Sequence, residues 1–361
     1  MLPRRQTDRT AISRAACDCE ADVVAGIDDV AHDELDWMFG TQMRFQQSAG
    51  RDLSGSLRFA YTGDLRQLLR PRTVQAVHLV LTFPVPRPRA LLGDEHFRAL
   101  LAAITLVRDL HPPGTYQTLY LSAAGAESAV LTRLKEELAR HTGLAIAAPE
   151  GDLQLRLRRP RAGGPGWEVL IRLSPRPLAT RPWRVCNLEG ALNATVARAM
   201  AVLTAPHDDD VFLNLACGSG SLLIERALCA PAYRLIGCDT SPAALACARE
   251  NCQAANLAAL AELDDWDAGA LPIPDAAVDA LCADLPFGHL VGSHTENVAL
   301  YPRIMREAAR VARRGARFAL LTHEVRLMES VLAEVGAWET LAIRRVALGG
   351  LHPRIFVLRR R

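Results

Sequence analysis

Short apolar runs of strand length alternate with helically spaced segments through the C-terminal half of the chain. The runs that predict strands are 211–215, 234–238, 277–283, 317–322 and 354–358. The segments with the spacing of an amphipathic helix are 191–203, 222–228, 242–255 and 301–313. Alternating strands and helices are typical of a parallel sheet covered by helices on both faces. The pattern therefore predicts an α/β domain over residues 191–361, with a doubly wound, Rossmann-like sheet that binds its ligand beyond the carboxyl ends of the strands.

The N-terminal half shows a mixed pattern of shorter elements. Helical spacing occurs at 28–39, 65–70, 94–110 and 126–141. Strand patterns occur at 56–61, 76–83, 116–122, 153–157 and 167–173. These elements predict two small α/β units within residues 20–175, behind a disordered tail at 1–19. The proline-containing stretch 176–190 is interpreted as a linker to the α/β domain.

The composition is that of a globular protein and narrows the functional classes. With 361 residues, of which 50% are hydrophobic and 23% charged, the chain is long enough for two or three domains. The formal net charge is 42 − 40 = +2, which gives no polyelectrolyte character. Because no apolar stretch approaches about 18 residues and Met1–Thr10 leads into no apolar run, neither a membrane span nor a signal peptide is expected. Nine cysteines, mostly in apolar segments, indicate reduced thiols in a cytoplasmic protein without a bound metal.

Positive charge is concentrated in one segment. Between Leu153 and Arg184 there are eight arginines and one acid, Glu168, so this segment carries 8 − 1 = +7 and the remaining chain 2 − 7 = −5. Such a cluster favours binding to RNA phosphates, with a merely solvated face as the alternative. The predicted RNA-binding residues are Arg156, Arg158, Arg159, Arg161, Arg181 and Arg184.

A glycine loop follows the strand at 211–215. Asn214–Ser221 (NLACGSGS) ends this strand and leads into a helix, and its glycines let a ligand approach the main chain. Dinucleotide-binding loops carry a third glycine where this chain has Leu223, which argues against NAD. Asp239 comes 21 residues after Gly218, at the end of the next strand, where a carboxylate binds ribose hydroxyls. S-adenosylmethionine, a nucleoside without a pyrophosphate, fits these features.

Acidic residues also follow the later strands. Asp267, in the segment Asp264–Asp267, is placed to accept a hydrogen bond from an adenine amine, and Trp266 either lines the ring or belongs to the core. The predicted cofactor-binding residues are Asn214, Ala216, Cys217, Gly218, Gly220, Asp239, Thr240, Asp267 and Asp284.

The segment Asp284–Gly288 (DLPFG) has the chemistry to bind an aromatic exocyclic amine. Such a nitrogen is a poor nucleophile because its lone pair is delocalised into the ring, so acceptors for its two protons stabilise the charge that develops during methyl transfer. The Asp284 carboxylate and the Leu285 main-chain carbonyl supply these acceptors, while Pro286 stiffens the turn and Phe287 stacks on the base. These four residues are the predicted catalytic residues.

From about residue 185 onward the chain resembles class I S-adenosylmethionine methyltransferases, and more narrowly the THUMP-containing tRNA guanine-N2 methyltransferases. The segments that carry the resemblance are Asn214–Ser221, Gly237–Ser241 (GCDTS), Asp265–Asp267 (DWD), Asp284–Gly288 and the upstream stretch Leu173–Met200. The resemblance implies a ferredoxin-like unit at 20–70 and a THUMP RNA-binding unit at 75–175, for which YTGDLRQLL, HTGLAI and GDLQLRL are diffuse matches.

Two residues depart from the pattern of the family. The glycine motif usually opens with an acid, where this chain has Asn214, and we expect weakened rather than abolished cofactor binding. Many relatives have (Asp/Asn)-Pro-Pro-(Tyr/Phe) at the catalytic motif, where the second residue here is Leu285. Since that position contributes a carbonyl, its side chain can vary. An aspartate at 284 favours a guanine amine over an adenine amine.

The sequence thus predicts a monomeric, cytoplasmic enzyme that transfers a methyl group from S-adenosylmethionine to the N2 amine of a guanosine in RNA, and the resemblance implies tRNA. Three alternatives stay open: a ribosomal RNA guanine-N2 methyltransferase, an adenine-N6 nucleic-acid methyltransferase, and an RNA-binding protein with a degenerate catalytic domain. A NAD-dependent oxidoreductase fits less well, for lack of the third glycine.

Overall fold

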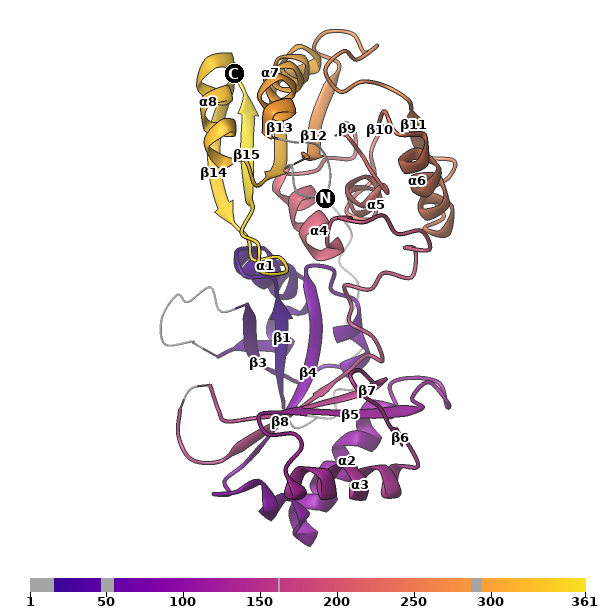
Figure 1. Ribbon diagram of the computed structural model, residues 1–361, viewed down its shortest axis with the longest axis vertical. Coiled ribbons are helices and arrows are strands. Elements are labelled where there is room, and N and C mark those ends of the chain that lie inside the picture. The colour runs from indigo at the N-terminus through magenta and orange to yellow at the C-terminus, as the bar shows by residue number, and fades with distance from the viewer. Residues whose placement is uncertain (1–15, 47–54, 162, 287–293) are drawn as a thin grey trace.

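The chain folds around two β-sheets that lie one above the other in an elongated molecule (Figure 1). The computed structural model describes residues 16–46, 55–161, 163–286 and 294–361. One sheet is built from the N-terminal half of the chain and the other from the C-terminal half, so each half has a sheet of its own. Within the described ranges no helix combines the length and apolar character needed to cross a bilayer.

The N-terminal sheet has eight strands in the order β2-β3-β1-β4-β8-β7-β5-β6. Its strands are β1 (Cys17–Val23), β2 (Met43–Phe45), β3 (Ser56–Tyr61), β4 (Val74–Phe83), β5 (Thr118–Ala123), β6 (Ala145–Ile146), β7 (Leu153–Arg158) and β8 (Trp167–Arg172). The long strand β4 pairs with β1 on one side and β8 on the other, both antiparallel. One continuous sheet therefore runs through both predicted N-terminal units.

Helices pack on this sheet through their apolar stripes. They are α1 (Asp28–Phe39), α2 (Asp94–Arg108) and α3 (Ala129–Thr142), with 3-10 turns at Gly40–Gln42, Leu65–Leu69 and Pro88–Leu92. In α2, the buried positions Leu100, Ile104 and Val107 follow the helical period and face the core. The segment 65–70, predicted to be a helix, forms only a short 3-10 turn. Pro71 ends this turn before a full α-helical hydrogen-bond pattern forms.

The C-terminal sheet has seven strands in the order β11-β10-β9-β12-β13-β15-β14. Its strands are β9 (Val211–Leu215), β10 (Arg234–Cys238), β11 (Ala261–Asp264), β12 (Val278–Asp284), β13 (Ala312–Thr322), β14 (Trp338–Arg345) and β15 (Arg354–Arg360). The helices are α4 (Ala194–Leu203), α5 (Ser221–Ala227), α6 (Pro242–Ala254), α7 (His294–Val311) and α8 (Val325–Val335). The first five strands in this order are parallel, whereas β15 is antiparallel to both β13 and β14.

This topology confirms the predicted α/β, doubly wound fold. The chain winds outward from β9, first through β10 and β11 and then back through β12 and β13. The order reverses between β9 and β12, and at such a switch point the loops diverge and leave a crevice beyond the strand ends. The candidate site lies there.

Several local predictions were wrong at their boundaries. The strand β1 begins at Cys17, so the predicted tail extends three residues into a sheet. The alternation in CDCEADV is regular, but cysteine and alanine are small and give a weak apolar signal. The helix α8 and the strand β14 were not predicted, and α7 begins at His294 rather than at 301.

The cysteine prediction is also corrected at one pair. Cys186 and Cys247 form a disulfide that ties the segment before α4 to helix α6, across 61 residues of sequence. The other seven cysteines, all within the described ranges, take part in no disulfide. Because the two partners lie far apart in the chain, no local spacing could have indicated their pairing.

Candidate active site

A cavity of about 640 Å³ lies beyond the carboxyl ends of β9, β10, β11 and β12. Nine of the predicted site residues line it: Ala216, Cys217, Gly218, Asp239, Thr240, Asp267, Asp284, Leu285 and Pro286. Residues from four separate segments thus meet at one edge of the sheet, as the strand-end positions of their motifs predicted. Phe287 lies outside the described residues.

The glycine loop turns back on itself directly after β9. The Cys217 amide donates to the Cys238 carbonyl of β10 at 2.8 Å, and the Gly220 amide donates to the Cys217 carbonyl at 2.9 Å. Gly218 has φ +53°, and a Cβ built on it would meet no other atom within 4 Å, so the loop presents bare main chain to the cavity. Gly220 has φ +80° but packs against Ala248 of α6. Gly220 therefore shapes the loop from behind and does not line the cavity.

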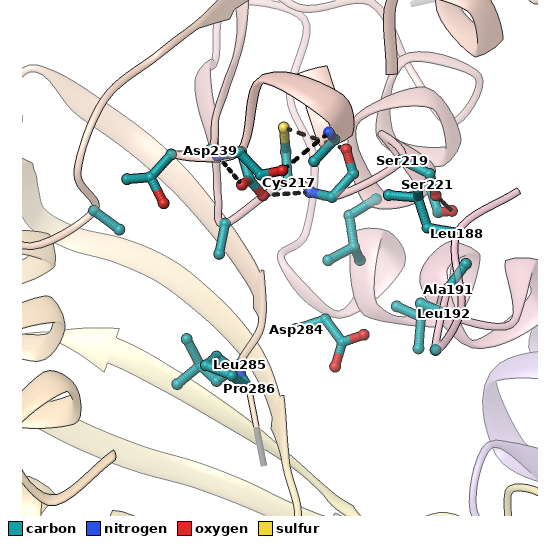
Figure 2. Close-up of a pocket in the computed structure, with 18 of the residues that line it drawn as sticks. Leu188, Ala191, Leu192, Cys217, Ser219, Ser221, Asp239, Asp284, Leu285 and Pro286 are labelled. Carbon is teal, nitrogen blue, oxygen red and sulfur yellow. Dashed lines mark hydrogen bonds between the residues drawn. The ribbon is translucent and has the colours of Figure 1, made fainter. Parts of the chain in front are cut away.

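The Asp239 carboxylate braces this loop. Its Oδ2 accepts from the Gly218 amide and its Oδ1 accepts from the Ser241 amide, both at 2.9 Å. Ser241 in turn caps helix α6, with its Oγ accepting from the Ala244 amide at 3.3 Å. A carboxylate has about four acceptor positions, so two main-chain donors leave Asp239 able to accept from two further hydroxyls in the cavity (Figure 2).

Asn214 lies deeper than the sequence predicted. Its side chain is fully buried, and its Nδ2 donates to the Leu215 carbonyl at 3.2 Å and to the Cys282 carbonyl of β12 at 3.3 Å. Asn214 therefore joins the ends of β9 and β12 and is absent from the residues that line the cavity. An amide can donate to these carbonyls, which an acid in its ionised form cannot do.

The Asp267 carboxylate lines the cavity and also accepts hydrogen bonds from the protein. Its Oδ1 accepts from the Gly269 amide at 2.8 Å and its Oδ2 from Arg303 at 2.6 Å. The hydrogen bond from Gly269, and then the Arg303 guanidinium, lower the pKa of Asp267, which stays ionised. Trp266 lines the cavity beside it and also packs on the core, and its contact with the adenine ring stays a prediction.

Asp284 ends β12 and borders the cavity. Figure 2 shows its carboxylate turned into the space between the glycine loop and the Leu285–Pro286 turn. Its Oδ1 is buried and has no hydrogen-bond partner among the described residues, and burial raises the pKa of Asp284 to about 7. A buried acceptor without a donor is costly in a folded protein, and such groups concentrate at functional sites. The Leu285 amide pairs with the Leu321 carbonyl at 3.0 Å and anchors the turn to β13.

One wall of the cavity comes from a segment that was interpreted as a linker. Leu188–Leu192 lines the cavity opposite Asp284, and we call this segment the strap. Arg184 holds the strap by donating to the Leu192 carbonyl at 2.7 Å and to Ser221 Oγ at 2.8 Å. The strap carries no motif of charged or aromatic residues, so its role could not be deduced from sequence.

Helix α7 supplies a second wall that was not predicted. Glu296, Asn297, Leu300 and Ile304 line the cavity from this helix. The sequence signal was present, since these residues recur at helical spacing directly after the DLPFG motif.

Several arginines of the basic cluster have acidic partners on other elements. Arg156 pairs with Asp22 at 3.0 Å, and Arg158 pairs with Glu168 at 2.9 Å and more closely with Glu20. These carboxylates neutralise much of the local charge that the sequence count of +7 suggested. By contrast, Arg159 and Arg161 are exposed, and the Arg159 guanidinium lies 4.2 Å from the centre of the Trp167 ring.

Residues 181–354 match a family model described as an RMKL-like, methyltransferase domain of the UPF0020 family. This region of the chain is therefore similar to that methyltransferase domain. The curated relatives include a tRNA (guanine(6)-N(2))-methyltransferase THUMP3 of Mus musculus, 32% identical over 185 residues that cover 47% of this chain and 36% of the relative. The match therefore spans about a third of that relative's length.

A tRNA (guanine(6)-N2)-methyltransferase of Thermus thermophilus is similar over a larger share of both chains. It is 28% identical over 297 residues, which cover 75% of this chain and 88% of the relative. The crystal structure of TrmN from Thermus thermophilus superposes with a TM-score of 0.74 and 24% identity, covering 95% of this chain and 99% of that one. The fold of this chain, both sheets included, is therefore that of the TrmN structure.

Proposed function

We propose that this protein transfers a methyl group from S-adenosylmethionine to the exocyclic N2 amine of a guanosine in tRNA. The Asp284 carboxylate is the observation that carries the proposal. It ends a parallel strand at the switch point of a methyltransferase domain, borders the cavity, and has an oxygen to which no residue in the described part of the chain donates a hydrogen bond. The names of the relatives favour guanine N2 as the methylated atom and tRNA as the substrate.

The residues around the glycine loop fit S-adenosylmethionine, which supplies the methyl group when bound. Asp239 has acceptor capacity left for the two ribose hydroxyls after it has accepted from Gly218 and Ser241. The bare main chain at Gly218 leaves room for the ligand beside the loop. Asp267, already ionised, is the acceptor for the adenine amine and keeps its pairing with Arg303.

Asp284 and the turn after it act on the guanine that is displaced from its stack. The Asp284 carboxylate and the Leu285 carbonyl accept the two protons of the N2 amine, which aims the nitrogen and stabilises the positive charge that develops on it. The proton leaves after methyl transfer, so this chemistry requires no strong general base. Phe287 stays predicted to stack on the base.

The N-terminal sheet, predicted to contain a THUMP unit, holds the RNA backbone in this proposal. Arg159 and Arg161 are exposed arginines of the basic cluster and contact phosphates directly in this proposal. Arg156 and Arg158 reach phosphates only by exchanging their carboxylate partners, so we propose a smaller contribution from them. We further propose that the protein acts as a monomer in the cytoplasm.

The test is methyl transfer to unmodified bulk tRNA, followed by mass spectrometry of the nucleosides. N2-methylguanosine is the expected product. N6-methyladenosine would replace the guanine assignment with adenine, and transfer to ribosomal RNA alone would replace the substrate. A protein that binds RNA but not S-adenosylmethionine would be a non-catalytic RNA-binding protein, and the proposal would fall.

The rate of methyl transfer is expected to rise with pH and to level off above about 7. Burial raises the pKa of Asp284, so below that pH the free enzyme holds the carboxyl in its neutral form, which is a weaker acceptor for the amine protons. kcat/KM should then fall about tenfold per pH unit on the acid side. An Asp284→Asn variant should lack this dependence. A wild-type profile that is flat from pH 5 to 8 would contradict the role given to Asp284.

A further inference from the structure

The carbonyl of Pro286 receives two hydrogen bonds from helix α7. Asn297 Nδ2 donates to it at 2.9 Å, and Tyr301 Oη donates to it at 2.7 Å. Asn297 and Tyr301 are both fully buried and lie one helical turn apart, so their side chains extend from the same face of α7. A main-chain carbonyl at the mouth of the cavity is thus held from inside the protein.

The direction of each proton in this network can be determined. The Pro286 carbonyl only accepts, so the Tyr301 hydroxyl must donate to it. Tyr301 Oη lies 2.8 Å from Thr322 Oγ1, and with its own proton used it accepts from Thr322. Thr322 Oγ1 accepts in turn from the Glu324 amide at 3.0 Å. A directed chain of hydrogen bonds therefore runs from the turn between β13 and α8, through two hydroxyls, to the Pro286 carbonyl.

This chain fixes the segment that bears the two proposed acceptors. Asp284, Leu285 and Pro286 are consecutive, and the Leu285 carbonyl carbon is bonded to the Pro286 nitrogen, so a displacement of the Pro286 main chain shifts the Leu285 carbonyl and loosens the support of Asp284. The described residues give this turn one further main-chain anchor, the hydrogen bond from the Leu285 amide to Leu321. Without the donors from α7, the acceptors would sample several orientations.

We propose that Tyr301, with Thr322 behind it, is a positioning residue for methyl transfer, which orients Asp284 and Leu285 without touching the substrate. The inference rests on the proposed function. It assigns to α7 and to the β13–α8 turn a part in catalysis that the motifs of the chain do not reveal. The reacting nitrogen needs both acceptors aligned at once, and small misplacements of such groups are costly to the rate.

The test compares Tyr301→Phe with the wild type at saturating S-adenosylmethionine and RNA. We expect kcat to fall about tenfold, while the KM for RNA and the Kd for S-adenosylmethionine stay within about twofold of the wild-type values. Thr322→Val should cause a smaller fall, because Tyr301 can still donate to Pro286. The matched control is Thr204→Val, which removes an equally buried hydroxyl at the end of α4, bonded to the Ala201 carbonyl at 2.7 Å, and should leave kcat unchanged.

A second readout keeps the inference separate from the proposed function. Hydrogen exchange of the Leu285 amide should be at least about threefold faster in Tyr301→Phe than in the wild type, whether or not the RNA substrate is correct. Wild-type kcat together with wild-type exchange would overturn the inference, and so would a loss of S-adenosylmethionine binding in proportion to kcat, which indicates general damage. Absence of methyl transfer by the wild-type protein would instead overturn the proposed function.

Discussion

Replacing Asp284 with alanine is expected to lower kcat for methyl transfer by about a thousandfold, while the binding of S-adenosylmethionine stays largely intact. Removal of one preorganised group that stabilises developing charge typically costs 10²–10³ in rate. The loss here should lie at the upper end, because the carboxylate both stabilises the charge and aims the nitrogen. Asp239 and Asp267 bind the cofactor in this scheme and are unchanged. Single-turnover transfer and calorimetric binding of the cofactor measure the two quantities.

Two further variants make the Asp284 experiment specific. Asp284→Asn keeps one acceptor oxygen and should lose less activity than the alanine variant. Asp279→Ala removes a carboxylate from the opposite end of the same strand, where it pairs with Arg313 and the Val211 amide, and should leave transfer near the wild-type rate. Near wild-type kcat in Asp284→Ala would show that another group binds the amine.

Much of the catalytic half could be predicted because its signals are local. The strands at 211–215 and 234–238 were predicted with the bounds that the structure has, since each is a short apolar run bounded by turn residues. Once these strands are parallel neighbours, their carboxyl ends share one edge, and the glycine loop, Asp239 and Asp284 must converge there. The site followed from topology plus three short motifs.

The parts that were missed depend on contacts between distant segments. The basic cluster is an example, because its count of +7 included one acid, Glu168, whereas Glu20 and Asp22 reach the same arginines from strand β1. The strap is another, since Leu188–Leu192 becomes a cavity wall only through the bonds of Arg184 to Leu192 and Ser221. Contacts between residues more than a hundred positions apart produce no repeating pattern in the sequence. The same holds for contacts made by a segment that forms neither helix nor strand.

Glu225 is the most consequential of the residues that sequence analysis passed over. It lies in the apolar helix α5, where a single acidic residue is expected to face solvent. Its side chain is nevertheless fully buried. Arg72, just before β4, donates to both of its carboxylate oxygens at 2.8 and 2.9 Å, and Arg181 donates at 2.8 Å. One carboxylate therefore connects the N-terminal sheet, the segment before α4 and the methyltransferase domain.

Replacing Glu225 with alanine is expected to lower the free energy of unfolding by about 3–5 kcal/mol. Removing one partner of a buried ion pair leaves the other charge buried and unpaired. The resulting destabilisation is larger than the net stabilisation that the intact pair provides. Here the Arg181 side chain is 4% exposed, so water cannot replace the lost carboxylate. Because Arg72 loses its partner too, contact between the two halves of the chain should weaken along with stability.

Urea unfolding of Glu225→Ala against wild type measures this effect, and Glu262→Ala is the matched control. Glu262 also forms a bidentate pair with an arginine, Arg234, but both side chains are more than 40% exposed, so its loss should cost less than about 1 kcal/mol. Equal destabilisation by the two variants would show that burial does not set the strength of the Glu225 contacts. A larger loss in Glu225→Ala, with the N-terminal half becoming sensitive to proteolysis at lower urea concentration, would establish that this carboxylate holds the N-terminal half in place against the C-terminal domain.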